Sequence, residues 1–209
     1  MIPAREALER LKEGNLRFVS DARRSRARLG EARREELTEG QRPFAIVLGC
    51  SDSRVPAEIV FDQGLGDLFV VRVAGNVVAP SQVGSVEFAA TRFGTRLVVV
   101  LGHSGCGAVQ ATLEELRKPT GDRSPGLASI IDRIRPAVEG LLETELGRDE
   151  EALAGAAVRA NIRASADHLR HGSRALERLS QEEGLAVVGA EYSLESGVVE
   201  FFDGVGARA

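Results

Sequence analysis

The chain has 209 residues, of which 43% are hydrophobic, and a formal net charge of -4. This length and composition suit one sizeable domain with its own core. The mild acidic balance gives no electrostatic reason to expect nucleic acid as a partner, and two cysteines are too few for a disulfide framework.

The N-terminal segment predicts a helix followed by a charged connection. Residues 4–19 place apolar side chains on one helical face, with Glu and Arg between them. Residues 20–40 are strongly charged and predict an exposed linker and a short helix from about 30 to 39. Within it, ARRSRAR at 22–28 is interpreted as a solvated basic loop, with a phosphate-binding patch as the less favoured alternative. We expect residues 1–40 to form a helical arm.

The compartment is also predicted from these patterns. The start, MIPAREALER, is charged within its first turn and lacks the apolar centre of a secretory signal. An uninterrupted apolar run such as Leu97 to Leu101 is far too short to cross a bilayer. We therefore expect a cytoplasmic protein with reduced thiols and no membrane partner.

From residue 44 onward, short apolar runs alternate with helical segments. FAIVLG, DLFVVRV, RLVVVLG and LAVVGAEY are β-branched runs typical of strands buried on both faces. The segments between them predict helices, including a long helical stretch from Pro125 to Glu183. The end, EYSLESGVVEFFD, predicts an antiparallel edge around a turn. The fold class expected is α/β, a mainly parallel central sheet flanked by helices, with residues 41–209 as a single domain.

Two of the predicted strands end in the same way, with a glycine followed by residues that can bind a metal. FAIVLG is followed by Cys50, Asp52 and Arg54, and RLVVVLG by His103 and Cys106. The carboxyl ends of parallel strands form the ligand crevice of an α/β sheet, so these side chains can converge. Thiolate and imidazole are ligands that zinc prefers, and three of them leave one position open, as in catalytic sites. Asp52 is the nearby candidate for a fourth ligand.

Simpler interpretations exist for each part of this pattern. A single cysteine after a strand is most often a small buried hydrophobe. GHSGCGA alone could be a glycine-rich phosphate loop, although it lacks the P-loop Lys-Ser/Thr and the dinucleotide spacing. His168 and His171 lie three residues apart on a predicted helix and are interpreted as an exposed pair. Only the combination of the two segments is specific.

Together, CSDSRVP at 50–56 and GHSGCGA at 102–108 resemble the β-class carbonic anhydrases. The resemblance extends to GQRPFAIVLGCSDSR, GDLFVVRVAGN and VVGAEYSLESGVVEF in the same order, and so covers nearly the whole chain. It implies a Zn2+ cofactor held by Cys50, His103 and Cys106, and reversible hydration of CO2 to bicarbonate. It also implies a homodimer or a dimer of dimers, with the N-terminal arm wrapped over the neighbour.

The resemblance also implies roles for further residues. Asp52 and Arg54 match the paired catalytic Asp and Arg of the family. A second group matches positions at the substrate: Gln41, Phe69, Phe88 and Gly107. Gln41 points to the plant-like branch, and Phe88 is expected to reach the site of a partner subunit.

One family feature is absent from this chain. Some members have a Trp three residues before the first ligand cysteine, beside a non-catalytic bicarbonate site that uses an Arg and a Tyr. Arg72 and Tyr192 match the latter two, but Val47 stands at the Trp position, and the chain contains no Trp. Bicarbonate regulation of that kind is therefore not expected.

Two other functions stay open at this point. The same scaffold could hydrolyse CS2 or COS, a difference that depends on access to the pocket. Alternatively, the metal could serve structure or regulation in a protein that is not an enzyme. Asp52, Arg54 and Gln41 argue against the second possibility, because a structural metal does not need them.

Overall fold

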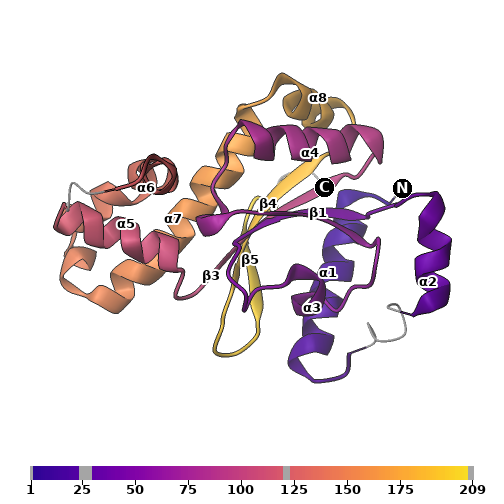
Figure 1. The fold of residues 1–209 in the computed structure, drawn as a ribbon, viewed down its shortest axis with the longest axis horizontal. Coiled ribbons are helices and arrows are strands. Elements are labelled where there is room, and N and C mark those ends of the chain that lie inside the picture. Colours follow the sequence, from indigo (N-terminus) through magenta and orange to yellow (C-terminus); the bar gives the residue numbers. More distant parts are fainter. Residues whose placement is uncertain (1, 24–29, 120–122, 207–209) are drawn as a thin grey trace.

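A five-stranded mixed sheet forms the centre of the molecule (Figure 1). The computed structural model describes residues 2–23, 30–119 and 123–206. The strands are β1 Ala45–Gly49, β2 Leu68–Arg72, β3 Leu97–His103, β4 Ala186–Tyr192 and β5 Val199–Asp203. They lie in the order β2-β1-β3-β4-β5, with the first four parallel and β5 antiparallel to β4. The predicted fold class is therefore confirmed, including the antiparallel edge near the C-terminus.

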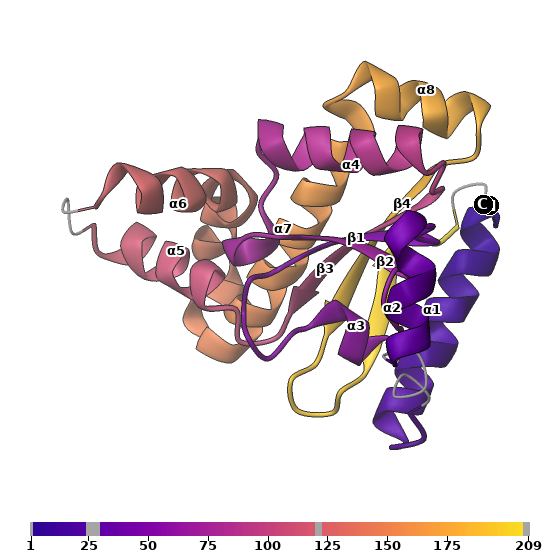
Figure 2. The same ribbon diagram turned by 45° about the vertical axis from the view of Figure 1, so that its right-hand side comes forward.

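Helices cover both faces of this sheet (Figure 2). They are α1 Ala4–Val19, α2 Glu31–Glu36, α3 Ala57–Val60, α4 Pro80–Arg92, α5 Gly107–Arg117, α6 Pro125–Val138, α7 Glu150–His171 and α8 Arg174–Glu182. The predicted helical stretch from Pro125 to Glu183 is thus divided among α6, α7 and α8, with 3-10 turns between α6 and α7. None of the helices in the described ranges is both long and apolar enough to cross a membrane.

Alternate residues of each strand pack into two separate cores. Ile46, Leu48 and Val100 point toward the face covered by α4, α7 and α8. Val47 and Val99 point toward the face covered by α1 and α3. Since successive strand side chains point to opposite faces, a strand covered on both sides must be apolar throughout. This explains the continuous apolar runs in the sequence.

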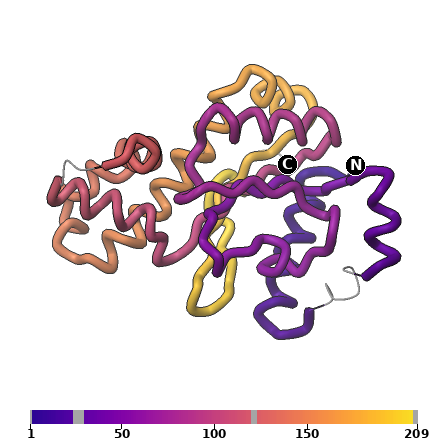
Figure 3. The backbone as a smooth tube through the Cα atoms, in the orientation of Figure 1, coloured from indigo at the N-terminus to yellow at the C-terminus, as the bar shows by residue number. Residues whose placement is uncertain are grey.

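Helix α1 packs against its own chain. Its apolar face, which includes Leu8 and Leu11, is buried in the core on the α1 face of the sheet. The side chain of Asn15 joins the helix to the hairpin between β4 and β5, which Figure 3 shows at the lower edge of the trace, by donating to the carbonyl of Gly197 at 2.9 Å. The apolar face of α1 therefore has its partner within the chain, because the sheet supplies one.

The remainder of the predicted arm has less contact with the core. Helix α2 buries none of its residues, and Leu16 and Val19 on α1 are exposed. The basic stretch at 22–28 lies mostly outside the described residues, so its interpretation stays a prediction. Any wrapping of residues 1–40 around a second subunit depends on these exposed parts.

Candidate metal centre

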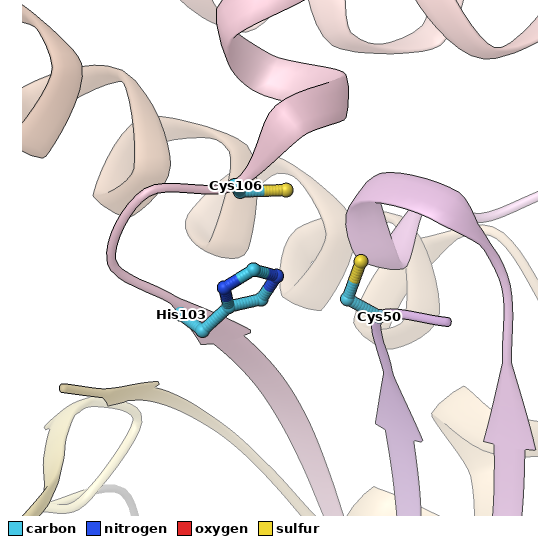
Figure 4. Close-up of side chains that lie close together, drawn as sticks. All are labelled: Cys50, His103 and Cys106. Atoms are coloured by element: carbon cyan, nitrogen blue, oxygen red, sulfur yellow. The ribbon is translucent and has the colours of Figure 1, made fainter. Parts of the chain in front are cut away.

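Three side chains that can bind a metal meet at the carboxyl end of the sheet (Figure 4). Cys50 follows the last residue of β1, His103 ends β3, and Cys106 is the residue before α5. Strands β1 and β3 are parallel neighbours with Gly49 opposite Leu101, so their ends bring Cys50 and His103 together. All three side chains are buried, and their ligand atoms lie within 4.8 Å of one another.

The imidazole of His103 is oriented for metal binding. Its Nδ1 lies 3.0 Å from the carbonyl oxygen of Ser104, which can accept only if Nδ1 carries the proton. That tautomer leaves a lone pair on Nε2, a buried atom with no hydrogen-bond partner among the described residues. A buried acceptor without a partner is costly, and a metal ion between Nε2 and the two thiols satisfies it. The donor set therefore fits a tetrahedral metal site.

The surroundings favour a thiolate at Cys50. A hydrogen bond from Cys106 lowers the pKa of Cys50 to about 4 against the opposing effect of burial, and the backbone amides of Asp52 and Gly75 add to the lowering. The same pairing and burial raise the pKa of Cys106. Metal ions bind thiolates, so a metal bound here would displace the remaining proton of Cys106.

Asp52 and Arg54 form an ion pair beside the three metal-binding side chains. The guanidinium of Arg54 donates two hydrogen bonds to the Asp52 carboxylate, of 2.9 and 2.7 Å. These bonds hold the pKa of Asp52 well below its usual range. The carboxylate oxygen Oδ2 lies 3.9 Å from Nε2 of His103, so Asp52 borders the candidate metal position while Arg54 holds both of its oxygens.

The loop that carries these residues is held from β2. The guanidinium of Arg72, the last residue of that strand, donates to the carbonyls of Cys50 at 3.0 Å and Asp52 at 2.6 Å. Tyr192, which matched the other residue of the family's bicarbonate site, is buried in the core on the α1 face. Through its two hydrogen bonds, Arg72 therefore holds the loop between Cys50 and the Asp52–Arg54 pair.

Of the four predicted substrate residues, only Gly107 lies at the metal-binding side chains. It is the first residue of α5, directly after Cys106. Gln41 lies before the amino end of β1, whereas Cys50 follows its carboxyl end. The five residues of β1 alone separate them by roughly 17 Å. Gln41 therefore cannot contact a substrate at the metal-binding side chains of its own chain.

Phe69 and Phe88 also lie toward the amino end of the sheet. Their rings are 6.3 Å apart and both contact the ring of Phe93. Phe93 and Gln41 line the same cleft, which has a volume of about 970 Å³. Phe88 remains 53% exposed. Phe69 and Phe88 thus belong to an aromatic cluster with Phe93, which borders the cleft that Gln41 lines.

His168 and His171 are both exposed on the last turn of α7. They do not belong to the one candidate metal cluster found among the described residues. The interpretation of this pair as exposed surface residues is confirmed.

The sequence analysis missed two residues that connect Cys50 to helix α7. Gly75 donates its backbone amide to Sγ of Cys50, and Asn161 of α7 donates to the carbonyl of Gly75. The signal for Gly75 was the Gly-Asn pair in VRVAGN, which indicates a turn. The signal for Asn161 was a polar residue at a position where the periodicity of its helix predicts an apolar one.

The fold and the side chains described above define an α/β protein with a candidate metal site at the carboxyl ends of two parallel strands. The family model for carbonic anhydrase matches residues 45–199. The chain belongs to the β-carbonic anhydrase family.

Individual relatives agree with this assignment. The chain is 41% identical to a carbonic anhydrase of Mycolicibacterium smegmatis over 93% of this chain and 91% of the relative. It is 25% identical to the crystal structure of the β-carbonic anhydrase CafA of Aspergillus fumigatus, with a TM-score of 0.74 over 96% of this chain and 90% of the other. It is also 25% identical to a tetrameric β-carbonic anhydrase from Sordaria macrospora, with a TM-score of 0.71 over 80% of this chain and 84% of the other.

Proposed function

We propose that the protein catalyses the reversible hydration of CO2 to bicarbonate and a proton, with Zn2+ as its cofactor. The observation that carries this proposal is the buried set of Cys50, His103 and Cys106 with the Asp52–Arg54 ion pair beside it. Membership of the carbonic anhydrase family supports the reaction.

Zinc is the metal that suits this donor set, because it prefers thiolate and imidazole ligands in tetrahedral sites. When bound, it supplies a Lewis acid that makes hydroxide available near neutral pH. Three protein ligands leave the fourth position for the reacting molecule.

Asp52 and Arg54 then act on the nucleophile. An ionised carboxylate can only accept hydrogen bonds, so Asp52 accepts a hydrogen bond from the nucleophile and directs the oxygen lone pair toward CO2. Arg54 keeps the carboxylate ionised and occupies both of its oxygens, which prevents Asp52 from becoming a fourth ligand itself. Asp52 is therefore the catalytic residue, and Arg54 sets its position and charge.

Gly107 contributes a backbone donor. As the first residue of α5, its N–H has no acceptor within the helix and carries the positive end of the helix dipole. That N–H is suited to an oxygen of CO2 or bicarbonate. Because Gly107 is exposed and follows a ligand directly, the substrate can approach it without displacing another side chain.

Gln41, Phe69 and Phe88 act on the substrate bound to a second subunit. The separation of Gln41 from its own Cys50 supports a role across the subunit interface, and the exposed ring of Phe88 provides an apolar surface for contact. A two-fold dimer is reciprocal, so each cleft at the amino end of a sheet would complete the metal centre of the partner. We therefore propose a homodimer or a dimer of dimers, in which the exposed parts of residues 1–40 also contact the neighbour.

A stopped-flow CO2 hydration assay on the zinc-loaded chain tests this proposal. Rapid, zinc-dependent proton release identifies a carbonic anhydrase. Release of hydrogen sulfide from CS2 or COS without CO2 hydration identifies the alternative hydrolase. A zinc-containing chain that converts none of the three substrates has a non-enzymatic role. The cytoplasmic location and the plant-like branch stay predictions.

A further inference from the structure

Helix α7 reaches the metal centre through a chain of two hydrogen bonds. Nδ2 of Asn161 donates to the carbonyl oxygen of Gly75 at 2.8 Å. The backbone N–H of the same glycine donates to Sγ of Cys50 at 3.3 Å. Asn161 is only 2% exposed, so water does not replace it as the donor.

The conformation of Gly75 depends on its lacking a side chain. Its φ angle is +67°, in the left-handed region that favours glycine. A Cβ atom here would lie 2.8 Å from Cδ1 of Ile134 and 3.0 Å from Cβ of Ala108. The tight turn that directs its N–H at the sulfur therefore needs both the glycine and an anchor for its carbonyl, which Asn161 provides.

The next residue of α7 fixes the depth at which the helix lies on the sheet. Ile162 is fully buried. A Cβ atom on Gly102 of β3 would lie 2.5 Å from its side chain, and one on Gly189 of β4 would lie 2.9 Å from it. Ile162 thus occupies a hollow left by glycines on two adjacent strands. Gly102 directly precedes His103, so the same turn of α7 contacts the segment that carries His103 and is linked to Cys50 through Gly75.

We infer that Asn161 is a positioning residue of the metal centre, which holds the N–H of Gly75 on the thiolate of Cys50. A hydrogen bond to a metal-bound thiolate withdraws electron density from the sulfur, and partners of this kind tune the metal. Without it, Cys50 becomes a stronger electron donor with a less well-defined orientation. This inference rests on the proposed function, because it requires a metal at Cys50, His103 and Cys106.

The test uses the full chain, stripped of metal and loaded with Co2+ alone. Asn161→Leu keeps most of the side-chain volume without the donor, and Asn161→Ala removes both. For both variants we expect cobalt affinity, measured by competition with a chelator, to fall about 10- to 100-fold. The thiolate-to-cobalt charge-transfer band should move to longer wavelength, because losing the hydrogen bond raises the energy of the sulfur lone pair.

Leu169→Ala is the matched control. Leu169 is fully buried on the same helix, about two turns beyond Asn161. This variant should lower the thermal unfolding temperature but leave the band and the cobalt affinity unchanged. An unchanged band and affinity in both Asn161 variants would overturn the inference, as would equal changes in the Leu169 control.

Two further measurements test the inference even if Asn161→Leu and Asn161→Ala do not fold. Asn161→Gln retains an amide donor and should keep the band closer to that of the unaltered chain. In the unaltered chain loaded with cadmium-113, the amide proton of Gly75 should couple to the metal through the sulfur. Absence of that coupling overturns the inference. If the unaltered chain binds neither cobalt nor cadmium, the proposed function itself fails, which distinguishes the two failures.

Discussion

The two oxygens of Asp52 are both bound by the guanidinium of Arg54, at 2.9 and 2.7 Å, while Oδ2 lies 3.9 Å from the imidazole Nε2 of His103. The same carboxylate is thus close enough to the metal-binding side chains to compete for the metal and is restrained from doing so. Catalysis as proposed above depends on that restraint.

Arg54→Ala should therefore lower CO2 hydration by at least about 100-fold, the effect of losing a positioned catalytic group. With the restraint removed, the carboxylate can turn toward the metal and exclude the nucleophile. Arg54→Lys keeps the charge but lacks the planar fork, so it should retain part of the activity. Stopped-flow kinetics measures both, and crystal structures of the alanine variant at low and high pH locate the carboxylate. A remote Asp52 at both pH values would rule out this explanation.

The same Arg54→Ala substitution should raise the pKa of Asp52. Its pKa is lowered mainly by the hydrogen bonds from Arg54. The ion pair therefore stabilises the folded state above the ordinary carboxylate pKa of about 3.9, and this contribution is lost as the pH falls toward the lowered value. Carbon-13 NMR should show no titration of Asp52 near pH 4 in the unaltered chain, and a midpoint closer to 4 in Arg54→Ala. A normal midpoint in both would mean that the ion pair does not form in solution.

Metal content should depend on Cys106. The chain should bind about one zinc ion, and Cys106→Ala should lose it, because two remaining ligands hold zinc weakly. His168→Ala is the control, since that histidine is exposed and lies outside the candidate cluster. Elemental analysis of the purified proteins measures the ratio. A metal-free chain with full activity would refute the proposed chemistry.

Mixed dimers test the role of Gln41 across the subunit interface. Gln41→Ala alone should reduce kcat/KM about tenfold, as expected for one lost hydrogen bond. A purified heterodimer of a Cys106→Ala chain with a Gln41→Ala chain should recover about half of the wild-type activity, because one of its two sites is fully native.

The matched control places both substitutions on one chain and pairs it with an unaltered chain. Its single metal centre then faces the altered Gln41, so its activity should stay about tenfold below that of the first heterodimer. If the second heterodimer is the more active one, Gln41 acts within its own chain.

Asn15 should contribute strongly to stability. Its side chain donates to the carbonyls of Val60 and Gly197 and accepts from the backbone N–H of Val199. Asn15→Ala should lower the free energy of unfolding by about 3 kcal/mol, roughly 1 kcal/mol for each hydrogen bond. Glu13→Ala, exposed on the same helix, should change it little. Urea unfolding measures both, and equal stability of the two variants would contradict the assignment.

The strands and the metal-binding residues could be predicted from the sequence for a physical reason. A parallel strand that is covered on both faces must be apolar throughout, and the ends of neighbouring parallel strands converge. Once the ends of the strands were located in the sequence, Cys50, His103 and Cys106 could be placed close together.

The partner of α1 could not be predicted in that way. An amphipathic pattern shows which face is buried but not against what. The structure shows a close approach at Gly14, where a Cβ atom would lie 1.9 Å from the carbonyl oxygen of Phe61. Removing residues 1–30 would expose the core that α1 covers, so we expect the truncated chain to be unfolded.

The position of Gln41 could be predicted in part from the sequence, since a complete strand separates it from Cys50. The resemblance assigned its role without stating which subunit it serves. Asn161 belongs to no motif, and its function depends on where α7 crosses the sheet, a tertiary relationship that helical periodicity does not contain.

The contact between α7 and the glycines of β3 and β4 has a consequence for the order of events during synthesis. Cys50 leaves the ribosome long before His103, and Asn161 and Gly189 follow much later still. The contacts that bring Cys50 to His103 and α7 to both strands are therefore distant in sequence, and such topologies fold slowly because long loops must close first. Tight metal binding should appear only after the C-terminal strands have joined the sheet, which makes metal capture a late reporter of complete folding.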